Sequence, residues 1–158
     1  MIAEMTAEPY APRAGETVEL ALTDELNAAI SHAFAEACRS LSEGGSLTPF
    51  TIFGTSDGFD VTDHRGNTVE EIYASVAALV RRDAPEFYVF AYDGFVEAGG
   101  ASGDAILCEV AYRAGTEAYL LALPYTVCAE GYVFSQDYLY AGTAQPIYPC
   151  AIAFAVNG

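Results

Sequence analysis

The stretch that most constrains this fold is the apolar run over residues 86–96, EFYVFAYDGFV. Aromatic and β-branched side chains occur there at both odd and even positions, which is typical of a strand covered on both faces. Pro85 precedes the run and a glycine-rich stretch follows it, and these flanks favour a strand over a buried helix. We therefore predict a central strand that is buried on both sides.

The next segment predicts a turn and a second strand. Residues 97–104, EAGGASGD, supply glycines that adopt positive φ readily in a turn. Residues 104–113 then alternate between two sets of side chains, and Glu109 and Arg113 mark the more polar set. We expect this strand to expose that polar face.

A third strand is predicted over residues 117–127, after a tight turn at residues 114–116. Its Tyr, Leu and Val side chains share one parity. Pro124 has no N–H to donate to a ladder, which predicts that this strand lies at a sheet edge or bends there. The three strands together predict an antiparallel meander.

The remaining predicted elements flank this meander. Apolar side chains at three- and four-residue intervals predict two helices, and Thr68 and Glu71 form a capping box at the start of the second. These elements are helices over 24–42 and 69–82, hairpin strands over 47–53 and 59–62, and late strands over 132–140 and 148–156. The order α-β-β-α-β-β-β-β-β predicts an α+β domain with two helices packed on a mainly antiparallel sheet, and we expect both helices to cover one face.

Composition divides the chain into a leader and one domain. Residues 1–18 combine prolines, a glycine and acids, which predicts a flexible acidic leader, and residues 19–158 form the single α+β domain. The first residues have neither the basic nor the apolar region of a signal peptide, and no long apolar run predicts a transmembrane helix. A cytoplasmic location is therefore expected.

The charge of the chain excludes some partners. Twenty-two acidic residues face six basic ones, all arginine, and the formal net charge is −16. Such a charge repels phosphate backbones and anionic lipids, so we expect no nucleic acid and no membrane as partner. Two functions would explain this negative charge: binding of a basic protein partner, or mimicry of nucleic-acid charge. The alternative is that the charge serves solubility alone.

The four cysteines are expected to be free thiols. Cys38, Cys108, Cys128 and Cys150 have no CxxC spacing and lie in otherwise apolar segments. Buried, unpaired thiols fit that pattern better than a zinc site. No cofactor is predicted.

One polar group of residues has the chemistry of a metal site. Asp60, Asp63 and His64, in DGFDVTDHRG, offer carboxylate and imidazole ligands for a divalent ion. The spacing does not match a calcium loop of the EF-hand kind. The alternative is a solvated hairpin and a loop that leads into a helix, where Asp, Asn and Gly are the usual residues.

A second group suggests a ligand site. Asp93 stands near the end of the apolar central strand, where a carboxylate must be solvated, capped or paired, and Asp104 begins the neighbouring strand. Tyr125, Tyr132 and Tyr138 belong to a late cluster among the eleven tyrosines, and tyrosine suits pocket rims and interfaces. The alternatives are acids that mark strand ends and tyrosines on a half-exposed sheet face.

Catalytic motifs are missing from the sequence. There is no GxSxG, no phosphate loop and no dinucleotide fingerprint. His32 falls off the apolar stripe of its helix and is expected to be exposed. No catalytic residue is predicted, and whether the protein is an enzyme is left open.

The order of the elements over residues 24–127, helix, hairpin, helix and meander, resembles that of roadblock and longin-type domains. The resemblance implies a dimerising domain that acts as a scaffold for small GTPases, although the late strands depart from it.

Three functions fit these observations. The first is a non-catalytic, acidic protein-interaction or scaffold domain that homo-oligomerises. The second is a small enzyme or ligand-binding protein with a tyrosine-lined pocket. The third is an acidic decoy or immunity-type protein that binds a basic partner.

Overall fold

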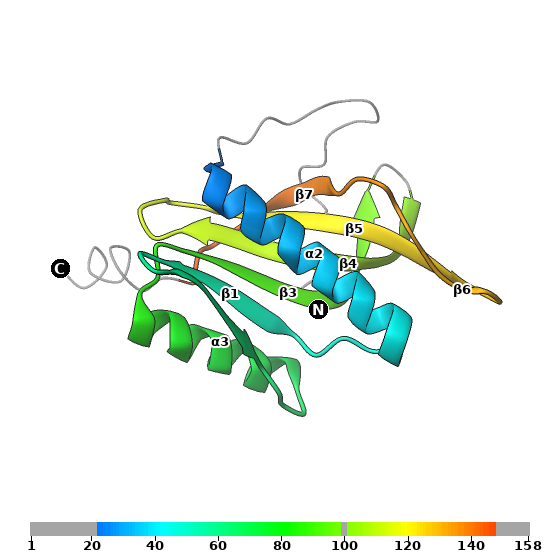
Figure 1. Ribbon diagram of the computed structural model, residues 1–158, viewed down its shortest axis with the longest axis horizontal. Coiled ribbons are helices and arrows are strands. Elements are labelled where there is room, and N and C mark those ends of the chain that lie inside the picture. Colours follow the sequence, from blue (N-terminus) through cyan, green and yellow to red (C-terminus); the bar gives the residue numbers. More distant parts are fainter. Residues whose placement is uncertain (1–21, 99–100, 148–158) are drawn as a thin grey trace.

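The computed structural model describes residues 22–98 and 101–147. These ranges form two helices and seven strands in the predicted order, which confirms the α+β class (Figure 1). The elements are α2 (Asp24–Gly44), β1 (Phe50–Thr55), β2 (Gly58–Asp63), α3 (Val69–Asp83), β3 (Phe87–Ala98), β4 (Ala101–Tyr112), β5 (Ala118–Cys128), β6 (Gly131–Phe134) and β7 (Leu139–Ala144).

One antiparallel sheet organises these elements. The strands follow the order β2-β1-β3-β4-β5-β6, and β7 also pairs with β5. The predicted central strand is confirmed, because β3 pairs with β1 and β4 and residues 87–92 are buried on both faces. The predicted meander is β3, β4 and β5.

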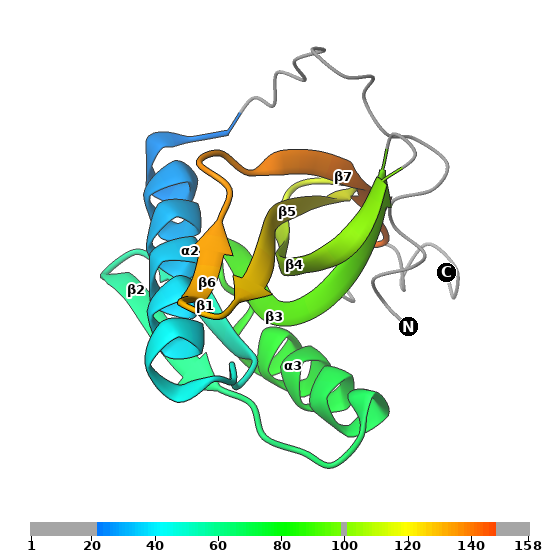
Figure 2. The same ribbon diagram turned by 90° about the vertical axis from the view of Figure 1, so that its right-hand side faces the viewer.

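The two helices cover opposite faces of the sheet (Figure 2). The buried stripe of α2 packs on the face that carries Val89 and Ile106. Val76 and Val80 of α3 pack on the other face, against Tyr88. The expectation that both helices share one face is wrong, because a strand that is apolar on both sides needs cover on each.

Both helices begin at a threonine cap, and the one at Thr68 is the predicted cap. Thr23 and Thr68 accept hydrogen bonds from the backbone N–H groups of Leu26 and Glu71, as N-cap side chains do. Glu71 completes its cap by accepting from the backbone N–H of Asn67 at 2.7 Å, one residue before the position that the capping box predicts.

Strand β4 is more deeply buried than the sequence predicts. Glu109 is only 3% exposed, and all residues from 105 to 111 are buried. The predicted polar face is therefore wrong at Glu109, which lies on the face shared with α3. The β3–β4 ladder also continues to the Ala98–Ala101 pair, so most of the predicted turn belongs to strand.

The predicted strand over 132–140 is divided in two. Strand β6 pairs with β5 up to Phe134, and the N–H of Ser135 continues that pairing to the carbonyl of Pro124. Pairing resumes at Leu139, so residues 136–138 bulge out between β6 and β7 along one edge of β5. Residues 141–144, predicted as loop, are strand, while the predicted strand 148–156 and leader 1–18 lie outside the described residues.

The three cysteines within the described residues are free thiols. Cys108 is buried as predicted, Cys38 is half-buried, and both are free. Cys128 is free but exposed at the β5–β6 turn, which contradicts its predicted burial, and Cys150 lies outside the described residues. Neither helix of the described ranges is long and apolar enough to cross a membrane.

Candidate functional site

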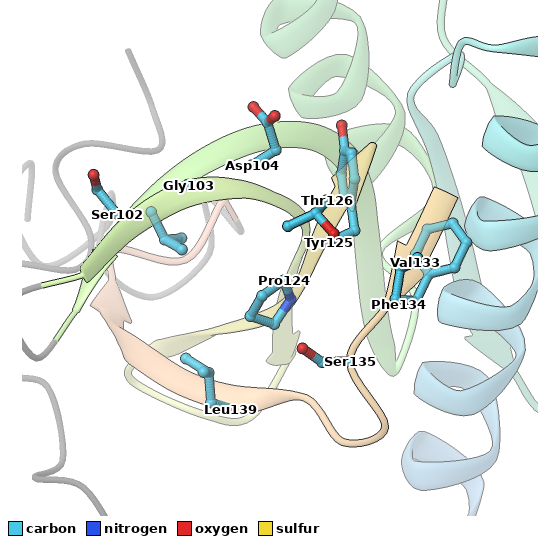
Figure 3. Close-up of a pocket in the computed structure, with 11 residues that line it drawn as sticks. Ser102, Gly103, Asp104, Pro124, Tyr125, Thr126, Val133, Phe134, Ser135 and Leu139 are labelled. Carbon is cyan, nitrogen blue, oxygen red and sulfur yellow. The ribbon is translucent and has the colours of Figure 1, made fainter. Parts of the chain in front are cut away.

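The candidate site lies where β4 and β5 separate. Their pairing ends at Ala105 and Pro124. Beyond it, β4 remains paired with β3 as far as residue 101, whereas β5 pairs with β6 as far as residue 128. We call the opening between residues 101–104 and 125–128 the fork (Figure 3).

Pro124 marks the start of the fork. It lacks an N–H, and its carbonyl accepts a hydrogen bond from Ser135 at 2.9 Å on the side away from β4. It therefore gives nothing to the β4 ladder. Strand β5 is not an edge strand, since it pairs with β4 on one side and with β6 and β7 on the other. The proline stands instead where β5 leaves β4.

Backbone polar groups face the fork from both strands. Because Pro124 directs its carbonyl toward β6, the alternation of an antiparallel ladder directs the N–H and C=O groups of Tyr125 and Val127 into the fork. The same alternation directs those of Ser102 and Asp104 into it from β4. Among the described residues, no strand pairs with either edge there.

A cavity of about 340 Å³ occupies the fork. Figure 3 shows that the side chains of Asp104 and Tyr125 point to one side of the fork, while Pro124 and Leu139 lie on the other. The second side is mostly apolar, with Val96 as a further wall. The fork thus has one acidic and aromatic side and one apolar side.

Three aromatic rings form a cluster beside the fork, on the α2 face of the sheet. The ring centroids of Tyr125 lie 5.5 Å from Tyr132 and 5.8 Å from Phe134, and Tyr132 and Phe134 stack at 5.9 Å. We call these residues the aromatic cluster. The hydroxyl of Tyr132 donates to the carbonyl of Gly45 at 3.4 Å, which ties β6 to the end of α2.

Two carboxylates accompany the aromatic cluster. The hydroxyl of Tyr125 donates to Oδ1 of Asp93 at 2.7 Å. Burial raises the pKa of Tyr125 above its usual range, and the hydrogen bond to Asp93 and the charges of Asp93 and Asp104 raise it further. Tyr125 is therefore a neutral hydrogen-bond donor, and its two acidic neighbours are exposed.

The structure brings together three of the four predicted ligand residues. Asp93 and Tyr132 both contact Tyr125 beside the fork, and Tyr125 alone of the three lines the fork cavity. Tyr138 lies apart, where its ring stacks on Phe34 of α2 at 5.1 Å. It lines a second hollow of about 680 Å³, between α2 and residues 134–138, which shares the walls Phe134 and Ser135 with the fork cavity.

The predicted metal ligands are arranged differently. Asp60 and Asp63 are exposed and point to opposite faces of β2. The imidazole of His64 is buried, and its Nε2 and Nδ1 lie 2.9 Å from the hydroxyls of Thr51 and Ser75. Burial lowers the pKa of His64, against the opposing charge of Asp63. No group of three or more ligand side chains suited to a metal occurs in the described ranges.

Sequence reasoning missed one buried acid. The hydroxyl of Tyr88 donates to Glu109 at 2.5 Å and accepts from the N–H of Ile147 at 3.1 Å. Burial raises the pKa of Glu109 to about 7, although the Tyr88 hydrogen bond opposes that rise. The nearby hydroxyl of Tyr92 has no hydrogen-bond partner among the described residues. The alternation of side chains along β4 predicted that Glu109 faces solvent. Its burial becomes clear only once both faces of β4 are known to be covered.

In comparisons with known proteins, no family model, curated protein or solved structure matches the chain. The resemblance to roadblock and longin-type domains is therefore one of element order alone.

Proposed function

We propose that this protein is a non-catalytic interaction domain that binds an extended segment of a partner protein at the fork. The observation that carries the proposal is the pair of strand edges, at residues 101–104 and 125–128, that no strand of the described residues pairs with, beside a cavity. An extended peptide that adds to such an edge gains main-chain hydrogen bonds, while pockets select its side chains. Strand addition therefore fits both features.

The chemistry at the fork favours binding over catalysis. The polar side chains that line the cavity are hydroxyls and one carboxylate, and no histidine or thiol is among them. Nucleophilic catalysis by a hydroxyl needs an adjacent base. His64, the buried histidine, already directs both ring nitrogens at Thr51 and Ser75.

Homo-oligomerisation is part of the proposal and uses a different edge. Strand β2 lies at the end of the sheet order, and its Phe59 and Val61 side chains are 43% and 53% exposed. Exposed apolar edge strands invite pairing with another chain. Light scattering of the wild type and of V61K tests this, since V61K is expected to shift an oligomer to monomer. A monomeric wild type at high micromolar concentration would contradict the oligomer.

The free thiols support a reducing compartment. Cys38, Cys108 and Cys128 are unpaired, as is usual in the cytoplasm, which is where we place the domain.

Peptide display tests the binding proposal. A random twelve-residue peptide library is selected on the wild-type protein, and the enriched peptides are measured against four variants. V127P and S102P each remove one N–H that faces the fork, so at least one is expected to lower affinity ten-fold or more. V127T and S102A keep the N–H at the same positions and are expected to bind as the wild type does.

Circular dichroism checks that the proline variants are folded. Amide chemical-shift changes that centre on Ser102, Asp104, Tyr125 and Val127 would locate the peptide at the fork. Failure to enrich any peptide, or enriched peptides that bind both folded proline variants as tightly as the wild type, would overturn strand addition.

A further inference from the structure

We infer that the segment accepted by the fork alternates basic and apolar side chains. This inference rests on the proposed function and specifies its partner. Successive side chains of a strand point to opposite faces of its sheet, so an added strand presents every second residue to each side of the fork. The two sides differ in chemistry, and the difference sets the sequence that fits.

The α2 side of the fork selects positive charge. Asp104 and Asp93 lie on this side with the aromatic cluster, and both carboxylates are exposed. The ion pairs that arginines form within the described residues involve Glu36, Glu43, Asp63 and Asp83. Neither Asp93 nor Asp104 is paired with a described arginine. A guanidinium or ammonium group is attracted both by carboxylates and by the faces of aromatic rings.

The opposite side of the fork selects apolar groups. Val96, Pro124 and Leu139 form most of its wall, with the hydroxyl groups of Thr126 and Ser135 at its margin. Leu139 is 37% exposed, so part of this wall meets water when the fork is empty. Aliphatic side chains in the cavity of about 340 Å³ would cover that surface.

Charge also decides between possible occupants. Strand β2 of a second copy would bring either Asp60 or Asp63, which point to opposite faces of β2, toward the acids of the fork, and like charges in contact are unfavourable. The formal net charge of −16 attracts a basic segment at long range. A basic segment of another protein is therefore the occupant that the fork fits.

Three six-residue peptides separate the two sides of the fork. Acetyl-RVRVRV-amide matches both sides, acetyl-QVQVQV-amide removes the charge, and acetyl-RQRQRQ-amide removes the apolar set. A fluorophore replaces the acetyl group of each peptide, and anisotropy measures its affinity in 50 mM salt. We expect RVRVRV to bind about ten-fold more tightly than either other peptide, from two exposed ion pairs on one side and apolar burial on the other.

Paired variants assign the charge to its residue. D104N is expected to weaken RVRVRV about three-fold and to leave QVQVQV unchanged. D137N removes the same charge from the second hollow and serves as the matched control, with no change for either peptide.

The outcomes distinguish this inference from the function on which it rests. Equal binding of RVRVRV and QVQVQV, with loss in V127P or S102P, would remove the basic preference and keep strand addition. Equal binding of RVRVRV and RQRQRQ, or equal weakening by D137N and D104N, would show adsorption to a charged surface and overturn the inference. If peptides selected from the library bind at the fork but RVRVRV does not, the alternation is wrong; if no peptide binds there, both proposals fall.

Discussion

Replacement of Glu109 by glutamine should make the protein more stable at pH 8 while leaving it nearly unchanged at pH 4. Glu109 is 3% exposed, and its one described hydrogen bond comes from the hydroxyl of Tyr88 at 2.5 Å. An ionised carboxylate is poorly solvated there, whereas the protonated acid and a glutamine amide are both neutral. E109Q keeps an oxygen that accepts from Tyr88.

The magnitude follows from the pKa of Glu109. Burial raises it from 4.5 to about 7, a rise of about 2.5 pH units. At about 1.4 kcal/mol per pH unit, ionisation in the folded protein costs about 3 kcal/mol. Between pH 4.5 and 7 the folded state keeps a proton that the unfolded state has lost, so the stability of the wild type falls as pH rises. Above pH 7 both states are ionised and the loss is complete.

Urea denaturation at half-unit steps from pH 4 to 8.5 measures this effect. The stability difference between E109Q and the wild type should grow by about 3 kcal/mol across that range, mostly between pH 4.5 and 7. His64 titrates in both proteins, so its contribution cancels in the difference. E117Q, at an exposed position, is the matched control and should show no such growth. A constant difference for E109Q would refute the reasoning.

Three further substitutions, two of them with a comparison variant, test a packing contact, a polar contact and a strained backbone position. G54A should destabilise the fold by about 1–3 kcal/mol, because its Cβ would overlap the Phe87 ring. G103A, whose Cβ meets open space, should have a stability within about 0.5 kcal/mol of the wild type. Thermal unfolding of both variants measures the difference. T51V should lower the free energy of unfolding by about 1–2 kcal/mol, because it leaves Nε2 of His64 unpaired in a buried site. S75A should lower it less, because Ser75 is exposed and water can replace its hydroxyl. A T51V variant as stable as the wild type would contradict the contact. A84G should stabilise the protein by about 0.5–1 kcal/mol, as measured by urea denaturation, because Ala84 ends α3 at φ 41°, where glycine is not strained.

Local periodicity predicted most of the fold. The stripes of α2 and α3, the cap at Thr68 and the two-sided burial of β3 each depend on residues near one another in sequence. The placement of the helices on opposite faces could not be read in this way. An apolar stripe indicates that one side of a helix is buried, but it does not indicate which face of the sheet the helix packs on.

Glu109 shows why parity alone misleads. An acid among alternating side chains is normally assigned to solvent, yet β4 lies inside the sheet and α3 covers the face that Glu109 shares with Phe90. The division of residues 132–140 into β6 and β7 has a similar cause. Residues 136–138 lie between the stretch that pairs with residues 124–128 of β5 and the stretch that pairs with residues 118–122, so the break depends on pairing with another strand and not on the local pattern.

The fork illustrates how the net charge acquires a location. Spread over the whole surface, the acids of this chain would serve solubility alone, and composition gives no reason to prefer a binding role. The sheet places Asp93 and Asp104 on neighbouring strands of one face, and Tyr125 fixes the first of them through its hydroxyl. Pro124 then ends the ladder beside them, so that charge, aromatic rings and backbone groups that no described strand pairs with occur at one point. Each of these features is ordinary by itself. Their coincidence distinguishes the fork from the other acidic surface that the structure describes, and it makes the D104N and D137N pair a decisive comparison.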